Sequence, residues 1–133
     1  MRAKDLIHLA EDIAIAVVPE VIEGNNGWMV YLINLKKNSV DNLLISSKGY
    51  GDLNNRKLRT SELRHFIPRL DSGNFVRVEP IMEDVFGLNN EYWVSFYEVG
   101  KVYDKKYLFL PESIQEKHFI NIPFLNRKGV MIK

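Results

Sequence analysis

Hydrophobic and polar positions alternate over residues 89–111, and this pattern predicts one long β-hairpin. If Val99 and Gly100 form a two-residue loop, one face of the hairpin is almost entirely apolar. The register then places Phe96 opposite Tyr103. A three-residue loop would suit Gly100 but would give a less uniformly apolar face. The two-residue loop therefore predicts a core-facing side formed by Tyr92, Val94, Phe96, Tyr103, Tyr107 and Phe109, interrupted by Lys105.

The opposite face of this hairpin mixes polar side chains with large apolar ones. It is too apolar for a fully wetted sheet, so either another element covers it or it contacts a partner or a second copy of the chain. In the second case, the residues expected to make the contact are Trp93, Tyr97, Leu108 and Leu110.

The N-terminal half of the chain predicts three further strands. Residues 13–18 are β-branched enough for a first strand, and Pro19 allows that strand to lie at a sheet edge. Residues 28–35 are apolar on both faces, which is typical of a central strand, and we expect a second hairpin with residues 42–47. Irregular structure is expected in the tail or short helical turn of residues 1–10 and in the loop of residues 48–55.

Residues 57–70 fit two patterns. The apolar side chains have helical spacing, but Pro68 and the alternation around it favour a strand, which we prefer. Residues 75–79 predict a half-buried strand, and Pro80 suits the start of a short helix over residues 81–86. A last short strand is predicted at residues 118–122.

The total of about seven to eight short strands and one short helix predicts an all-β fold. We expect an immunoglobulin-like antiparallel β-sandwich. At 133 residues the chain fits a single domain that spans residues 1–133, with residues 1–10 as its flexible tail.

Composition excludes several classes of function. The chain has no cysteine, which removes disulfides, thiolate catalysis and cysteine-ligated metals. Its net charge of +1 gives no global reason to expect nucleic acid or an anionic membrane as a partner. Acidic residues interrupt the apolar core that a signal peptide would need in the N-terminal segment. No apolar run reaches the ~18–20 residues of a membrane span. We therefore expect a cytoplasmic protein that does not bind membranes.

Candidate catalytic and metal-binding patterns are weak. The three histidines have no partner at ligand spacing except His8 with Glu11, a pair in the expected tail. Residues 46–51 lack the spacing of a phosphate-binding loop. Glu83 and Asp84 are adjacent and would point to different sides of a helix. We therefore predict no catalytic residues, no metal and no cofactor.

The stretch of residues 56–77 is the most basic part of the chain, with six Arg or Lys and two acidic residues. Tyr50 and Phe66 lie near enough in sequence to stack on bases, as in proteins that bind single-stranded RNA. The alternative is a solvated edge strand, since charged edges discourage aggregation between sheets. The cations that would contact nucleic acid are Arg56, Lys57, Arg59, Arg64 and Arg69.

Three segments resemble a small bacterial family whose members are sometimes labelled as a phenylalanyl-tRNA synthetase subunit. These segments are TSELRH (60–65), VEPIMEDVFGLNNEYWVS (78–95) and YDKKYLFLPESI (103–114). The resemblance covers about residues 28–133 and implies a tRNA-associated accessory module, without catalytic residues.

From these patterns we predict a non-catalytic interaction module, because the strands are clear and a nucleophile, metal or acid–base constellation is missing. It would bind a protein partner, or itself as a homo-oligomer, through the apolar hairpin face. The alternative is an RNA- or tRNA-associated module that uses the basic stretch.

Overall fold

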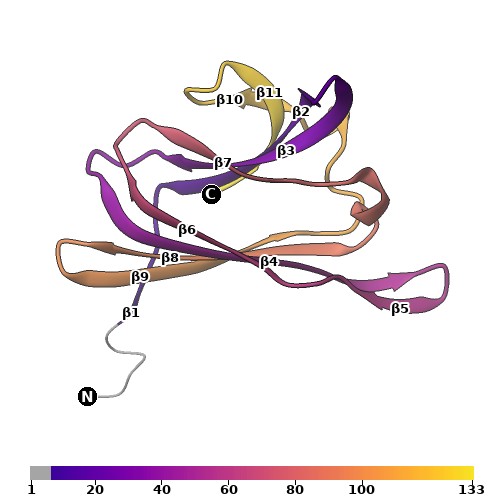
Figure 1. Cartoon of the computed structure of the whole chain (residues 1–133), viewed down its shortest axis with the longest axis horizontal. Coiled ribbons are helices and arrows are strands. Elements are labelled where there is room, and N and C mark those ends of the chain that lie inside the picture. The colour runs from indigo at the N-terminus through magenta and orange to yellow at the C-terminus, as the bar shows by residue number, and fades with distance from the viewer. Residues whose placement is uncertain (1–6) are drawn as a thin grey trace.

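The computed structural model describes residues 7–133, which form a sandwich of two β-sheets (Figure 1). Neighbouring strands are antiparallel, except that β1 runs parallel to β9. Sheet A has the order β1-β9-β8-β4-β5, with β6 also paired to β4, and sheet B has the order β10-β11-β2-β3-β7. The bounds in sheet A are β1 (Ile7–Leu9), β4 (Val40–Leu53), β5 (Arg56–Arg59), β6 (Leu63–Leu70), β8 (Asn89–Glu98) and β9 (Lys101–Phe109). Those in sheet B are β2 (Ile13–Ile22), β3 (Asn25–Asn34), β7 (Phe75–Pro80), β10 (Ile120–Ile122) and β11 (Arg127–Ile132).

The long hairpin of β8 and β9 has the predicted two-residue loop. Glu98 pairs with Lys101 and Phe96 with Tyr103, whose rings stack with centroids 5.4 Å apart. Val99 adopts a positive φ of 48°, as the tight turn requires. The predicted apolar face points into the sandwich, because a β-strand alternates its side chains between the two faces of the sheet.

The main core lies between the sheets. Ile15 and Leu32 from sheet B meet Ile45 and Phe96 from sheet A, and all four side chains are buried. A second apolar cluster lies on the outer face of sheet B, where Ala14, Ala16, Tyr31 and Ile33 pack with Ile122 and Leu125. The β10–β11 segment therefore covers part of that outer face (Figure 1).

The predicted second hairpin between residues 28–35 and 42–47 is wrong. β3 pairs with β2 and β7, whereas β4 lies in the other sheet. The buried side chain of Asn34 directs this crossing, because its amide donates to the carbonyl oxygens of Asn38 (2.9 Å) and Leu70 (3.0 Å). A polar segment after a strand can thus carry the chain between sheets as readily as it can reverse it.

Pro19 does not place its strand at an edge. It lies inside β2, which has β3 on one side and β11 on the other. β2 pairs with β11 only from Ile15 to Val17, so Pro19 has no partner residue on β11.

The predicted loop over residues 48–55 is also wrong, because β4 continues to Leu53. Only Asn54 and Asn55 turn the chain, both with positive φ. Gly51 sits inside the strand with φ 145°, a conformation that favours glycine. Residues 57–70 are extended as predicted, divided between β5 and β6.

The chain ends and the short helix also differ from expectation. Residues 7–9 form β1 instead of a tail or helical turn, and residues 1–6 lie outside the described residues. The predicted helix over residues 81–86 is one short turn, η2 (Glu83–Val85). The strand predicted at residues 118–122 begins only at Ile120, after η3 (Glu116–His118), and β11 follows it as the last strand. Neither helical turn, nor any other helix in residues 7–133, has the length and apolarity needed to cross a membrane.

Candidate functional site

The outer face of sheet A carries four exposed apolar side chains, which we call the apolar patch. They are Leu44 (55% exposed), Phe66 (57%), Trp93 (42%) and Tyr97 (46%). Leu44 pairs with Phe66 on one side and with Ser95 on the other, between Trp93 and Tyr97 on β8. Diagonal neighbours across a sheet lie about 7–8 Å apart, so the four side chains form one surface.

Small residues shape the surface of the apolar patch. Ser46 lies opposite Trp93, and Ser95 lies opposite Leu44. Together with Glu62 and Arg64 they line a shallow hollow of about 290 Å³ beside Trp93. The apolar patch therefore combines large exposed side chains with a recess that a side chain of a partner can enter.

The structure divides the four predicted contact residues. Trp93 and Tyr97 belong to the apolar patch. Leu108 lies on β9, opposite Glu91 of β8, and Leu110 follows the end of β9. Leu108 and Leu110 instead line a separate hollow with Met131 and Ile132. Leu44 was missed as a contact residue, although its alternation with the apolar Leu43 and Ile45, both buried, could have indicated it. Phe66 was predicted only as a residue that could stack on bases.

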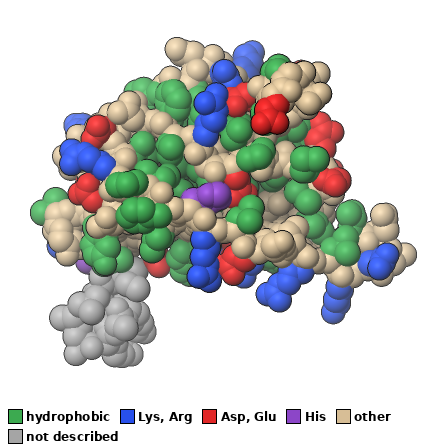
Figure 2. All heavy atoms as spheres, in the orientation of Figure 1, with side chains coloured by type: hydrophobic (Ala, Val, Ile, Leu, Met, Phe, Trp, Pro, Cys, Tyr) green, Lys and Arg blue, Asp and Glu red, His purple; other side chains and the backbone are tan. Residues whose placement is uncertain are grey.

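Three of the predicted nucleic-acid contacts lie together on the β4–β5 hairpin, which projects from the sandwich (Figure 1). Arg56, Lys57 and Arg59 are exposed and form no ion pair with any residue in 7–133. Figure 2 shows basic side chains at this end of the molecule. Lys57 and Arg59 pair with Asp52 and Tyr50, so they share the face of sheet A that bears the patch.

The remaining cations of the basic stretch are dispersed. Arg64 lies at the edge of the patch, with Glu62 3.9 Å away. Arg69 is held by Asp71 (2.7 Å) and lies 3.8 Å from Asp41. Arg77 belongs to sheet B. The structure therefore brings Arg56, Lys57 and Arg59 together but separates them from Arg69.

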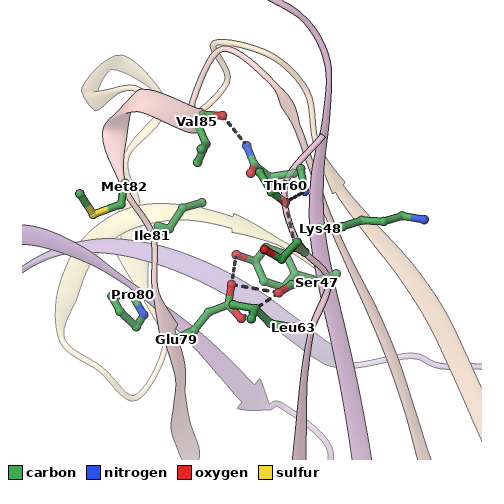
Figure 3. Close-up of a pocket in the computed structure, with 13 residues that line it drawn as sticks. Ser47, Lys48, Thr60, Leu63, Glu79, Pro80, Ile81, Met82 and Val85 are labelled. Atoms are coloured by element: carbon green, nitrogen blue, oxygen red, sulfur yellow. Dashed lines mark hydrogen bonds between the residues drawn. The ribbon is translucent and has the colours of Figure 1, made fainter. Parts of the chain in front are cut away.

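A polar cluster around Glu79 lies between sheet A and β7 of sheet B, and Figure 3 shows the hydrogen bonds of the Glu79 carboxylate. The Glu79 carboxylate accepts hydrogen bonds from the hydroxyls of Ser47 (2.8 Å) and Tyr92 (3.3 Å) and contacts His65 Nε2 at 2.7 Å. Burial and the neighbouring Glu79 charge raise the pKa of Tyr92, which keeps its hydroxyl a donor. Beside the cluster is a cavity of about 180 Å³ that Thr60 and Ile81 also line.

This arrangement differs from a nucleophilic triad. In a triad, histidine lies between serine and the carboxylate, so that it can take the serine proton. Here Glu79 lies between Ser47 and His65, and the serine hydroxyl is directed at the carboxylate. Ser47, His65 and Tyr92 all come from sheet A and Glu79 from sheet B, so the cluster joins the two sheets.

Glu79 was not predicted as a functional residue. Its position next to Pro80 carried no motif, and the partners are distant in sequence, with separations of 32, 14 and 13 residues. Among residues 7–133 there is no group of three or more acidic, histidine or cysteine side chains arranged to hold a metal ion. Comparison with known protein families and with curated proteins gives no match for the chain.

Proposed function

We propose that this protein is a non-catalytic interaction module that binds a protein partner, or a second copy of itself, through the apolar patch. The observation that carries the proposal is the exposure of Leu44, Phe66, Trp93 and Tyr97 side by side on one sheet face. Burial of one such side chain contributes about 1.5–3 kcal/mol, so a partner that covers the patch gains a substantial part of its binding energy there.

The composition of the patch supports a protein contact. Trp, Tyr and Arg are the residue types that dominate binding energy at protein interfaces, and Trp93, Tyr97 and Arg64 lie here together. Serines and charged residues surround the anchors, which matches the polar rim of an interface. The absence of cysteine supports a cytoplasmic location.

The first test measures self-association. Size-exclusion chromatography with light scattering compares wild type with Trp93→Asp, which places a charge in the centre of the patch. Val99→Asp is the matched control, because Val99 is 90% exposed in the hairpin loop and outside the patch. A dimer in wild type and Val99→Asp, but a monomer in Trp93→Asp, supports a second copy as the partner. Monomers in all three proteins remove that form of the proposal.

We also propose that the sandwich is immunoglobulin-like. In support, β2-β3-β7 face β9-β8-β4-β6, an order equivalent to strands A-B-E and G-F-C-C′ of such folds. The short turn η2 between β7 and β8 stands at the corner where those folds pass from one sheet to the other. In such domains partners often bind on a sheet face or at the loops, but this analogy assigns no activity.

The second candidate function is RNA binding. The specific observation in its favour is that the projecting hairpin places Lys57 and Arg59 on the face that also exposes Trp93 and Phe66. Cations beside exposed aromatic rings on a sheet bind single strands, by phosphate contact and base stacking. The resemblance described above would make tRNA the RNA to test.

RNA binding predicts a steep salt dependence, because each neutralised phosphate releases counterions. Fluorescence anisotropy with labelled tRNA and with a single-stranded oligonucleotide would give a log–log slope near −0.7 per contact for the single strand. Replacement of Arg56, Lys57 and Arg59 by Gln would reduce that slope by about 2, whereas Arg69→Gln would leave it unchanged. No binding at ~50 mM salt would remove this candidate.

A further inference from the structure

A second surface with a defined chemistry lies on the outer face of sheet B, and we call it the arginine groove. It has a volume of about 580 Å³ and is lined by Tyr31, Phe75, Val76, Arg77, Leu125 and Arg127. Its walls come from β7 and from the β10–β11 segment, which are far apart in sequence. Phe75 and Leu125 form the apolar part of the groove, and Arg77 and Arg127 form its cationic part.

The cationic part is organised by one carboxylate. Glu20, whose side chain is only 7% exposed, accepts hydrogen bonds from Tyr31, Arg77 and Arg127. Burial works to raise the pKa of Glu20, but these three hydrogen bonds outweigh it and lower the pKa. Glu20 therefore remains ionised beneath the groove and fixes both guanidinium groups in place.

Each arginine retains donors for a ligand. A guanidinium has five N–H groups in a planar fork, and Arg77 uses only Nε and Arg127 only one terminal nitrogen to hold Glu20. The side chains of Arg77 and Arg127 are 61% and 46% exposed, so their remaining N–H groups are accessible. Arg77 also lies over the ring of Tyr31 at 5.8 Å, which further restricts its position.

The apolar part of the groove lies directly beside these donors. The ring of Phe75 meets that of Tyr31 edge to face, with the ring centroids 5.8 Å apart, and the Phe75 side chain is 43% exposed. Leu125 packs against the outer cluster of sheet B and closes the opposite wall. A ligand that fits both parts needs an anionic group within reach of the arginines and an apolar group beside Phe75.

We propose that the arginine groove binds a small organic acid, with a carboxylate between Arg77 and Arg127 and an attached aromatic or branched apolar group over Phe75 and Leu125. The net charge of the site, two arginines against one glutamate, is complementary to a monoanion. Planar carboxylates match the guanidinium fork in two-bond geometry. The proposal is independent of the apolar patch, which lies on the other sheet.

The test uses 3-phenylpropionate and its neutral amide, 3-phenylpropanamide, titrated into the ¹⁵N-labelled full chain. Two-dimensional NMR would show saturable shifts at the backbone amides of Phe75, Arg77 and Arg127 with the acid. The amide would bind at least about tenfold more weakly, since it lacks the charge. Equal shifts with acid and amide, or shifts outside the groove, overturn the proposal.

Variants separate binding from structure. Arg77→Gln is expected to weaken binding of 3-phenylpropionate about tenfold or more. Arg56→Gln, which replaces an exposed arginine on the projecting hairpin, is expected to leave that binding unchanged. Because loss of Arg77 also breaks its ion pair with Glu20, a second variant, Phe75→Ser, is needed. Phe75→Ser removes the apolar contact without breaking an ion pair, and it is expected to weaken binding of the acid several-fold. Equal effects of Arg77→Gln and Arg56→Gln, or unchanged binding in Arg77→Gln, contradict a built site.

A peptide that ends in phenylalanine, with a free or an amidated C-terminus, distinguishes the source of the carboxylate. Binding of the free peptide as tightly as 3-phenylpropionate assigns the groove to chain termini. Binding of 3-phenylpropionate alone assigns it to a free acid. The absence of saturable shifts with either probe at millimolar concentration overturns the proposal.

Discussion

Phe96→Ala tests the interior of the sandwich at its most informative position. The Phe96 side chain is 1% exposed and stacks on Tyr103 with an angle of 13° between the rings. Removal of a buried phenylalanine costs about 3–5 kcal/mol, from lost transfer energy and from the cavity left behind. That is a large share of the ~5–15 kcal/mol with which a domain is usually folded.

Ser95→Ala is the matched control, one residue away in the same strand. Ser95 points to the outer face opposite Leu44, where it is half-buried. Its hydroxyl has no hydrogen bond to a described residue, so we expect a loss of less than about 1 kcal/mol.

Urea denaturation followed by circular dichroism gives both free energies of unfolding. The slopes of the two transitions should agree, because a change in slope would indicate a change in the unfolded state or in two-state behaviour. Equal losses in the two variants, or a larger loss in Ser95→Ala, would mean that the hairpin is inside out and would refute the register.

Three further perturbations probe other parts of the fold. Gly129→Ala should destabilise the chain by about 1–3 kcal/mol in thermal melts, because a Cβ there would lie 2.4 Å from the carbonyl oxygen of Val17; an unchanged melt would contradict this packing. Glu79→Ala should cost about 3 kcal/mol or more, since it leaves the buried hydroxyl of Tyr92 without its acceptor, and a loss no larger than that of Ser95→Ala would refute the role of the cluster. Because its folded-state pKa is lowered, Glu20 contributes stability that is complete above its usual value of 4.5 and is lost as the pH falls through the folded-state value. Glu20→Gln should therefore flatten the loss of stability below that pH in acid titrations, and parallel curves would count against it.

Period-two patterns predicted the elements that are half-buried. The β8–β9 hairpin alternates a core-facing side with an outer side, so its register followed from hydrophobicity alone and is confirmed. The same reasoning failed for residues 48–53, because Gly49 and Gly51 are residues typical of turns. Gly49 instead lets Thr60 and Asn90 approach the strand, a tertiary requirement that a local pattern does not contain.

Sites made of distant residues were only partly predictable. Trp93 and Tyr97 stood out because large apolar residues interrupt a polar face, but Phe66 joins them only through the pairing of β6 with β4. Glu20, Arg77 and Arg127 come from three strands, and their sequence spacing carries no signal. Strand order decides such neighbours, and the prediction that β3 and β4 form a hairpin had that order wrong.

The projecting end of β4 has a practical consequence for engineering. Beyond the body of sheet A, residues 51–53 of β4 pair only with β5, and a two-stranded ribbon on its own is marginally stable. Its turn at Asn54 and Asn55 is exposed, so the chain can be opened there without cutting into either core. A fluorescent reporter or a new pair of termini inserted between these two residues should leave the sandwich folded.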